Sequence, residues 1–312
     1  SFPKWMDHVP WTPTANCSMR KKVFEEINGF DRSFPDKPGG EDVEIIVVND
    51  GSKDDTVAYI QKHYSNVILL PQAQNLGFGQ GNNAGISLAM HNGATHVLLL
   101  NQDAWIEADM LEKLLPYDDG NSLLSPIHLN GEGDALDKNF KLHALMRADD
   151  YSRLIDDWAV GKTNKYATFE INAACWLLPA KIIREIGGFN PMFFHYAEDI
   201  NYLHRLHYHN KGVCFVPSAI AYHDRANVKE KPLNEQYMYQ QMVLRMININ
   251  DSACIANGKK LRFALSMIKI AISQGHYNYI FMLLRALRRI SKIKQEAKNN
   301  RILQEKVDSH WI

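Results

Sequence analysis

Hydrophobic residues in the first two thirds of the chain form short runs that are separated by segments of helical spacing. Near-continuous apolar runs at 43–50, 66–71 and 95–103 are typical of buried parallel strands. The segments that follow them, 51–64, 79–93 and 104–117, repeat their apolar residues at helical intervals. This alternation predicts a doubly wound α/β domain with a mostly parallel sheet, in which ligands bind beyond the carboxyl ends of the strands.

The pattern changes twice toward the C-terminus. Residues 123–169 are irregular and polar, and we expect loops and short strands there. A strand and a helix return at 171–189, and a helix at 198–212 and a strand at 213–224 follow. Beyond residue 226 the spacing is helical, with basic and apolar positions alternating. The sequence therefore predicts an α/β domain with a C-terminal helical tail.

Composition and charge limit the class of protein. The chain has 312 residues, of which 46% are hydrophobic, so it can bury a full core. Lysine plus arginine equals aspartate plus glutamate at 35 each, so we expect no nucleic-acid partner, but residues 226–312 hold 15 basic and 6 acidic side chains. Four scattered cysteines predict neither a zinc site nor a disulfide framework. We expect a cytoplasmic protein, because the first residues lack a signal-peptide pattern and no apolar run reaches about 18 residues.

Carboxylates end two of the predicted strands. Asp50, in VVNDGS, can accept a hydrogen bond from a nucleotide base or a ribose hydroxyl, or it can form an Asx-turn that caps the next helix. Asp103, in LLLNQD, is a natural ligand for a divalent cation beside a diphosphate, or an N-cap for the segment that follows. His223 ends the last strand and would join Asp103 as a second ligand, although a lone histidine is more often structural.

A glycine- and asparagine-rich segment, NLGFGQGNNAG at 75–85, permits two interpretations. Its amides suit sugar and ribose hydroxyls. The part GQGNNA, from Gly79, also fits the dinucleotide fingerprint of a dehydrogenase, with Asp103 about 20 residues further on. That fingerprint needs its first glycine directly after the strand, and here PQAQNLGF intervenes.

Two adjacent carboxylates, Glu198 and Asp199, begin a predicted helix in YAEDINYL. A helix N-terminus favours anions and keeps a carboxylate ionised, as a general base requires. The aromatic residues before them would exclude water and form an acceptor platform. The alternative is simple helix capping. His204, His207 and His209 are expected on a solvated or packed helix face.

Five motifs in one order carry a family resemblance: VVNDGS, NLGFGQGNNAGI, LLLNQD, GGFNPMFFHYAED and VPSAIAYHD. From about Glu44 to Arg225 the chain resembles the family-2 glycosyltransferases of GT-A fold, and within them the branch of bacterial rhamnosyltransferases and galactofuranosyltransferases. The resemblance implies a Rossmann-like catalytic domain that uses a nucleotide-sugar donor and Mg²⁺ or Mn²⁺.

The same resemblance implies roles for the motif residues. Asp50 would bind the nucleotide base, Asp103 the metal at the donor diphosphate, and His223 would complete the metal site. Asp199 would be the general base that deprotonates the acceptor hydroxyl in a displacement that inverts the anomeric centre. The other predicted site residues are Asn75, Gly77, Asn82, Asn83 and Asn101 on the donor side, and Glu198, Phe194 and Trp176 on the acceptor side.

Two departures from the family pattern shape the predicted domain organisation. Asn101 replaces the first acid of the D-x-D motif. The βα unit that precedes the EIIVVNDGS strand in such domains is absent, and residues 1–43, which contain Glu41 and Asp42, resemble the acceptor-side end of a second such domain. We therefore predict a fragment at 1–43, a catalytic domain at 44–225 and a basic helical tail at 226–312. The alternative is that residues 1–43 complete the sheet edge.

The predicted function is transfer of a sugar from a nucleotide-sugar donor to a glycan or lipid-linked acceptor in bacterial surface polysaccharide synthesis. The alternatives are a glycosyltransferase relic with residual nucleotide binding and, less favoured, an NAD-dependent dehydrogenase. Segment 259–294 has the pattern of an interfacial helix that docks on an anionic membrane at its inner face. The alternative for that segment is packing on the catalytic domain or on a second copy in a homo-oligomer.

Overall fold

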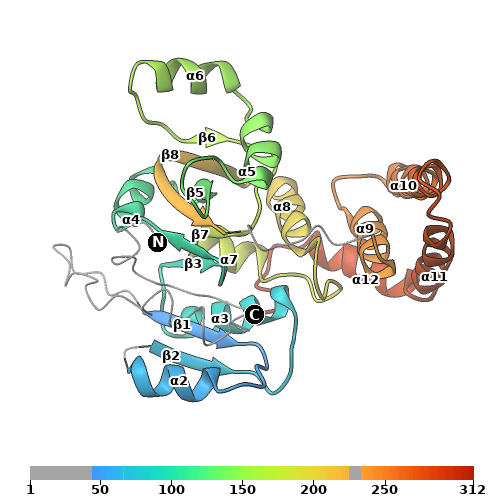
Figure 1. Ribbon diagram of the computed structural model, residues 1–312, viewed down its shortest axis with the longest axis horizontal. Coiled ribbons are helices and arrows are strands. Elements are labelled where there is room, and N and C mark those ends of the chain that lie inside the picture. Colours follow the sequence, from blue (N-terminus) through green and yellow to red (C-terminus); the bar gives the residue numbers. More distant parts are fainter. Residues whose placement is uncertain (1–43, 66, 225–232) are drawn as a thin grey trace.

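The computed structural model describes residues 44–65, 67–224 and 233–312. The predicted fragment at 1–43, with Glu41 and Asp42, lies outside these ranges. Within them the chain forms a mixed α/β domain followed by a group of helices, as predicted (Figure 1). None of the helices in these ranges is long and apolar enough to cross a membrane.

A small parallel sheet begins the described chain. Strand β1 (Ile45–Asn49) pairs in parallel with β2 (Val67–Pro71), and α2 (Thr56–His63) connects them. Helix α3 (Phe78–His91) follows and packs on β1. The apolar run of β1 is fully buried, which agrees with its near-continuous hydrophobic sequence.

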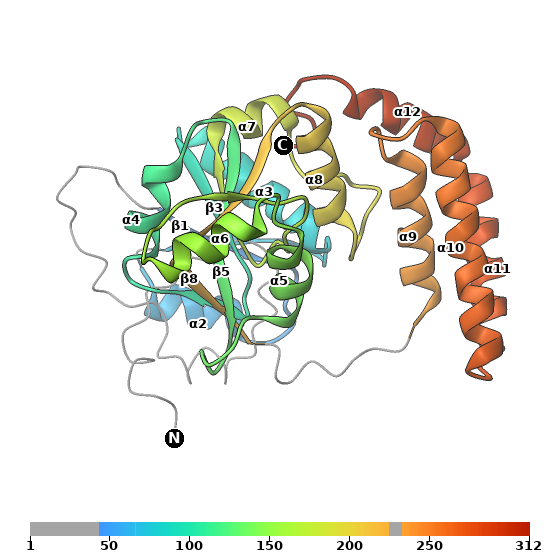
Figure 2. The same ribbon diagram turned by 90° about the horizontal axis from the view of Figure 1, so that it is seen from above.

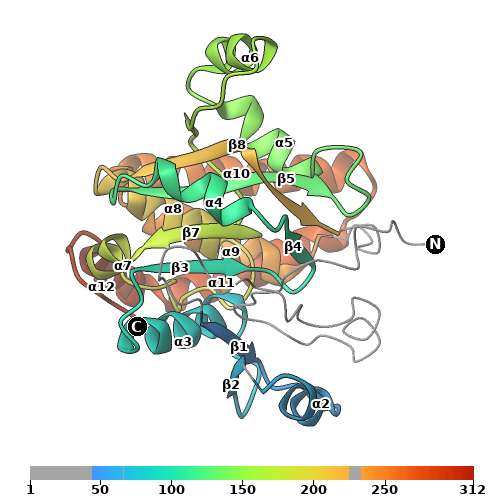
Figure 3. The same ribbon diagram turned by 90° about the vertical axis from the view of Figure 1, so that its left-hand side faces the viewer.

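Among the described residues, the larger sheet has six strands in the order β3-β7-β5-β8-β4, with β6 also paired to β8. Their bounds are β3 His96–Leu100, β4 Ala104–Ile106, β5 Ser122–Asn130, β6 Tyr166–Ala167, β7 Cys175–Pro179 and β8 Gly212–His223. Strands β3, β5 and β8 run in one direction. Strand β7 lies reversed between β3 and β5, and the short β4 and β6 pair antiparallel with β8. Figure 3 shows β1 and β2 beyond the β3 edge of this sheet.

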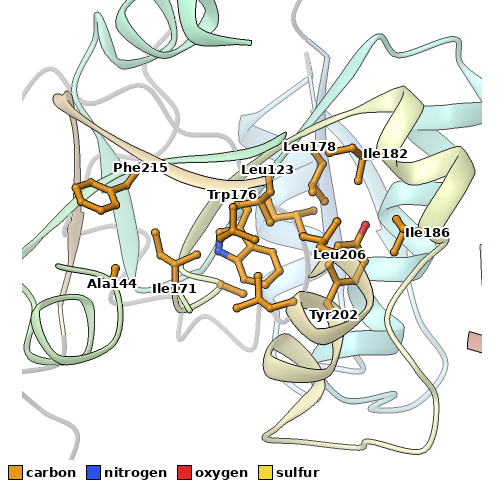
Figure 4. Close-up of a cluster of buried hydrophobic side chains, with 14 of the residues drawn as sticks. Leu123, Ala144, Ile171, Trp176, Leu178, Ile182, Ile186, Tyr202, Leu206 and Phe215 are labelled. Atoms are coloured by element: carbon orange, nitrogen blue, oxygen red, sulfur yellow. The ribbon is translucent and has the colours of Figure 1, made fainter. Parts of the chain in front are cut away.

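One hydrophobic core joins the sheet to its helices. It lies between β7, α3, α7 (Ala180–Ile186) and α8 (Glu198–Tyr208). The close-up in Figure 4 shows Trp176, Tyr202 and Leu206 meeting at its centre. Trp176 is fully buried and lies near Phe189, with ring centroids 6.2 Å apart. This position is a correction to the predicted acceptor-side role of Trp176, because a fully buried ring presents no face to an acceptor.

The predicted helix at 104–117 is wrong in its first part. Residues 104–106 form strand β4, and helix α4 covers only Met110–Leu114. Strand β4 forms because it pairs with β8 and because the Trp105 ring stacks on Tyr222, with centroids 5.4 Å apart. Asp103 therefore does not cap a helix. The helical spacing of the segment is overridden by its place at the sheet edge.

Residues 123–169 were expected to be irregular, but most of strand β5 lies in this segment. The β5–β8 pair is the longest strand pair among the described residues. Strand β5 pairs with β8 along its full length, and the register shifts between Pro126 and Ile127, where proline cannot donate to the ladder. Helices α5 (Lys138–His143) and α6 (Tyr151–Ala159) follow. Figure 1 shows α6 projecting from the body of the domain.

Within residues 233–312, which the structure describes, the chain forms four helices: α9 (Glu235–Ile247), α10 (Ala253–Ser273), α11 (Asn278–Lys292) and α12 (Lys294–Gln304). Helices α9, α10 and α11 lie side by side, and α12 leads back to the α/β domain (Figure 2). The Asn201 amide donates to Gln304 at 2.8 Å, and the Gly188 N–H donates to the His310 carbonyl at 2.8 Å. The C-terminal region is thus anchored on the domain at α7 and α8 rather than extended as a free tail.

Candidate active site

Strand pairing brings Asp103 and His223 together at one end of the larger sheet. Ala104 lies opposite His223 in the β4–β8 pair, and Asp224 N–H donates to the Asp103 carbonyl at 2.8 Å. The Asp103 Oδ1 atom is 3.3 Å from His223 Nε2. The His223 side chain is 2% exposed and that of Asp103 41%. The pair therefore combines a buried imidazole with a carboxylate that reaches solvent.

Asp137 lies on the other side of the His223 ring. Its Oδ2 atom is 3.7 Å from His223 Nδ1, and its Oδ1 atom accepts from the main-chain N–H groups of Asn139 and Phe140 at the start of α5. The buried Asp137 side chain thus caps α5 and lies close to the Nδ1 side of the His223 ring. Sequence pattern did not indicate this residue, because its only local signal is that of a helix N-cap.

The Asp103–His223 pair suits a divalent cation that also binds substrate oxygens. A carboxylate oxygen and an imidazole nitrogen are both acceptable to Mn²⁺, and Mg²⁺ is commonly bound by one or two carboxylates plus substrate phosphates. Among the described residues no group of three or more potential ligands forms a complete protein cage. The fit is therefore to a cation whose other ligands come from a diphosphate or water.

Asp50 organises the loop between β2 and α3. Its two carboxylate oxygens accept from the N–H groups of Leu76 at 2.6 Å and Gly77 at 3.1 Å. Burial raises the pKa of this carboxyl, and the two main-chain hydrogen bonds oppose the shift. Asp50 thus orders a loop that is distant in sequence. The sequence analysis had offered only a nucleotide contact or a local Asx-turn for this residue.

The same loop touches the segment before α8. Gly77 has φ of 81°, and a Cβ atom there would lie 2.0 Å from the Phe194 carbonyl oxygen. Asn75 accepts from the Gly77 N–H at 2.9 Å and is exposed. A Cβ at Gly79 would lie 3.6 Å from the Glu198 Cβ. The predicted donor-side loop and the predicted acceptor-side helix are therefore in direct contact.

Of the remaining predicted donor-side residues, Asn82 and Asn83 form hydrogen bonds within the protein, and Asn101 stays partly accessible to solvent. The Asn83 amide bonds to both main-chain groups of Phe189, at 2.8 and 2.6 Å, which joins α3 to the segment after α7. Asn82 is buried and donates to the Phe78 carbonyl within α3. Asn101 is half-buried and lies at the end of β3, two residues before Asp103. A structural role for Asn82 and Asn83 is a correction, because both were predicted to contact the donor.

The dehydrogenase fingerprint is not formed. Helix α3 begins at Phe78 with Gly77 as its N-cap, so Gly79 and Gly81 lie inside the helix. The fingerprint requires its first glycine in the strand-to-helix turn, next to a pyrophosphate. Gly79 instead permits close packing of α3 on the segment that contains Phe189, since an added Cβ would lie 3.0 Å from the Phe189 Cβ.

A strained turn delivers the two carboxyls at the head of α8. Tyr196 and Ala197 have φ of 72° and 75°, a left-handed conformation that side chains with a Cβ rarely adopt. Each such residue costs about 1–3 kcal/mol and persists where the surrounding structure requires it. Phe193 and Ala197 are buried against the core of the C-terminal helices, which fixes this turn from behind.

Burial changes the predicted ionisation of this pair. Desolvation and the neighbouring Asp199 charge raise the pKa of Glu198 to about 8. Desolvation also raises the pKa of Asp199, partly offset by its hydrogen bond from the Ile200 N–H. The helix N-terminus was predicted to keep a carboxylate ionised, and here burial opposes that effect in both residues. Glu198 is therefore mostly protonated at neutral pH.

The other predicted residues around α8 include one exposed side chain and two packed histidines. Phe194 is exposed next to the Gly77 loop, where an acceptor could contact its ring. His207 stacks on Phe169 with centroids 4.6 Å apart, and His209 lies 2.8 Å from the Gln304 carbonyl. These histidines are on a packed helix face, as expected.

Comparison with known proteins gives matches of two kinds. Residues 32–152 match the model of glycosyl transferase family 2. A dolichyl-phosphate beta-glucosyltransferase of Trichomonas vaginalis is 35% identical over 96 residues, which are 30% of this chain and 29% of that protein. The chain thus matches less than a third of the length of this curated relative.

Solved structures of low sequence identity also resemble the chain. Residues 1–349 of S. aureus TarS in complex with UDP give a TM-score of 0.47 at 15% identity, covering 84% of this chain and 79% of that one. GalNAc-T7 with UDP, GalNAc and Mn²⁺ gives 0.45 at 12% identity, covering 74% and 51%. Within the chain, the similarity to glycosyl transferase family 2 thus covers residues 32–152.

Proposed function

We propose that this protein is an inverting glycosyltransferase that moves a sugar from a nucleotide-sugar donor to a hydroxyl group of a glycan or lipid-linked acceptor. The observation that carries the proposal is the approach of Asp103 and His223 to 3.3 Å at the sheet end, in a chain with a family-2 segment. The contact between the Gly77 loop and the α8 head supplies a second, adjacent set of groups for the acceptor.

On the donor side, Asp103 and His223 are the residues that would bind Mg²⁺ or Mn²⁺. Such a cation offsets the charge that develops on a departing nucleoside diphosphate. We propose that Asp137, whose Oδ2 atom lies 3.7 Å from His223 Nδ1, helps to position the His223 ring when the cation is bound. Asp50 orders the Asn75–Gly77 loop, and we propose that this loop borders the nucleotide.

On the acceptor side, Asp199 takes the proton from the attacking hydroxyl. The acceptor oxygen forms a bond to the anomeric carbon, the bond from that carbon to the phosphate oxygen breaks, and the electron pair leaves with the nucleoside diphosphate. Burial and the neighbouring Asp199 carboxyl raise the pKa of Glu198 to about 8, so Glu198 holds its proton near pH 7 more strongly than an exposed glutamate does. We propose Asp199 as the base of the pair.

The finer identity of the reaction follows the family resemblance. We propose the rhamnosyltransferase and galactofuranosyltransferase-like branch, and a role in bacterial surface polysaccharide synthesis, because the motif order and the Asn101 variant resemble that branch. The predicted absence of a first βα unit, and a fragment at 1–43 without its own donor site, concern residues outside the described ranges and stay predictions.

A screen of nucleotide sugars tests the proposal. The chain is incubated with each donor in Mn²⁺ or Mg²⁺, and release of nucleoside diphosphate is measured with and without a chelator. We expect metal-dependent release with at least one donor. Metal-dependent binding of a nucleoside diphosphate without release from any donor would favour a non-catalytic relic. Binding of NAD without metal would favour the dehydrogenase alternative.

A further inference from the structure

The C-terminal helices have an inner face that forms their own core. Ala264, Met267 and Ala271 of α10 pack with Leu283, Ala286 and Ile290 of α11 and with the buried side of α9. Phe263, Ile268, Ile280 and Leu287, which were predicted to belong to a membrane face, pack against this core. These apolar residues therefore pack inside the C-terminal helices and are not available to contact a membrane.

A second apolar set remains on the outer side of the α10–α11 hairpin. We call it the hairpin face, and it consists of Leu261, Leu265 and Ile272 on α10 and Tyr277, Phe281 and Leu284 on α11. Their exposed fractions run from 49% to 67%. Intervals of three, four, seven and eleven residues place each set on one side of its helix. Exposed apolar side chains aligned in this way mark an interaction surface.

Charge around the hairpin face has one sign. Between Ser252 and Gln295 the sequence contains nine lysine or arginine residues and no aspartate or glutamate. Lys259 pairs with Asp251, and Arg289 pairs with Glu235. Arg262, Lys269, Arg288 and Lys292 are exposed and form no ion pair with residues that the structure describes. Exposed apolar side chains with a basic border fit a partner that has a negatively charged surface and an apolar interior.

Helix α6 provides an internal contrast. It also exposes an apolar side, with Tyr151, Ile155 and Trp158 at 49%, 45% and 76%. Its surroundings are acidic, since residues 149–157 include Asp149, Asp150, Asp156 and Asp157 and one basic residue, Arg153. Both α6 and the hairpin thus expose apolar side chains, but of these two surfaces the hairpin face has the basic border.

We propose that the hairpin face docks the protein on a membrane leaflet that contains anionic lipid. The apolar side chains enter the boundary between headgroups and acyl chains, and the basic residues contact the headgroup charges. Figure 2 shows α10 and α11 along one edge of the molecule, where a flat surface can reach them. This inference goes beyond sugar transfer and does not depend on it.

Vesicle flotation with the full chain tests the proposal. Vesicles of phosphatidylcholine alone are compared with vesicles that also contain phosphatidylserine. We expect flotation only with phosphatidylserine, and loss of flotation as salt is raised. The changes Leu265→Ser with Phe281→Ser, and Arg262→Gln with Arg288→Gln, should each weaken binding roughly tenfold or more. Ile155→Ser with Trp158→Ser on α6 is the matched control and should bind like the wild type.

The design separates docking from folding and from self-association. Point changes are preferable to truncation, because α12 and the residues after it are anchored on α7 and α8. Thermal unfolding of each variant verifies the fold. No flotation with phosphatidylserine, or equal loss in the α6 control, would overturn the proposal. A concentration-dependent dimer that Leu265→Ser with Phe281→Ser abolishes, without vesicle binding, would assign the face to a second copy instead.

Discussion

The strand-end pair and the α8 head are both candidate reaction groups, but the fold builds them by opposite means. Asp103 and His223 meet because β4 begins beside the end of the antiparallel strand β8, and the Asp103 side chain stays 41% exposed. Glu198 and Asp199 follow two residues in left-handed conformation, and burial raises both of their pKa values. An exposed carboxylate opposite a fixed imidazole suits ligand binding, whereas a desolvated pair of carboxyls suits proton transfer.

The largest expected effect comes from Asp199→Asn at the α8 head. The amide keeps the shape of the side chain but cannot accept the acceptor proton, so turnover should fall by about 10²–10⁴-fold. Binding of the nucleoside diphosphate should stay near the wild-type value, because that binding belongs to the strand-end pair. Single-turnover kinetics and a binding titration measure both quantities. Near-normal turnover would reduce Asp199 to a helix cap.

Gly77→Ala tests whether the two regions are joined through the loop. The added Cβ would lie 2.0 Å from the Phe194 carbonyl oxygen, in a left-handed conformation, and the turn must move. Gly93→Ala is the control, since Gly93 has φ of 85° and no atom within 4 Å of an added Cβ. Urea unfolding should give a cost of about 1–2 kcal/mol for the control and roughly 3 kcal/mol or more for Gly77→Ala. Equal costs would contradict the contact.

Asp137→Asn tests whether Asp137 supports cation binding by Asp103 and His223. Asparagine still caps α5, but it removes the negative charge from behind His223. Affinity for Mn²⁺ in the presence of nucleoside diphosphate should fall about 10–100-fold, because second-shell partners of metal-binding histidines contribute that much. Asp150→Asn, at the exposed cap of α6, is the control and should change nothing. Unchanged Mn²⁺ affinity in both variants would leave Asp137 a cap only.

The smallest expected effect is a pH dependence of stability from Glu198. Its pKa is raised to about 8, so the folded state binds this proton more strongly than the unfolded state does. The resulting stability is full below the ordinary pKa of glutamate and is lost as the pH rises through about 8. Glu198→Gln is neutral throughout, so its Tm relative to wild type should rise between pH 5 and pH 9, by about 2–4 °C per kcal/mol. The exposed Glu112→Gln should show no such trend.

Much of the fold follows from the sequence because burial leaves a plain pattern. The apolar runs at 43–50, 66–71 and 95–103 form strands close to their predicted bounds. Strand β4 was missed because its pairing with β8 overrides helical spacing, and β5 was missed because Pro126 and polar neighbours interrupt its pattern. Local pattern does not report which distant strand a segment will meet.

The candidate site was predictable to a similar degree. The family resemblance named Asp103 and His223 as partners, and strand pairing brings them together. The burial of Trp176 and the internal hydrogen bonds of Asn83 were not predictable, because a motif gives residue order and not side-chain direction. The ionisation of Glu198 was also beyond reach, since it depends on desolvation by the α3 side and the C-terminal helices.

Titration of Mn²⁺ against nucleoside diphosphate binding by wild type and Asp103→Ala tests the central claim most directly. Calorimetry with UDP, GDP and dTDP in parallel first identifies the nucleotide that binds. We predict that wild type binds it in Mn²⁺ and loses it in chelator, that Asp103→Ala has lost this metal dependence, and that His223→Gln is weaker in the same direction. Wild-type Mn²⁺ dependence in both variants, with their fold intact, would contradict a donor site at Asp103 and His223.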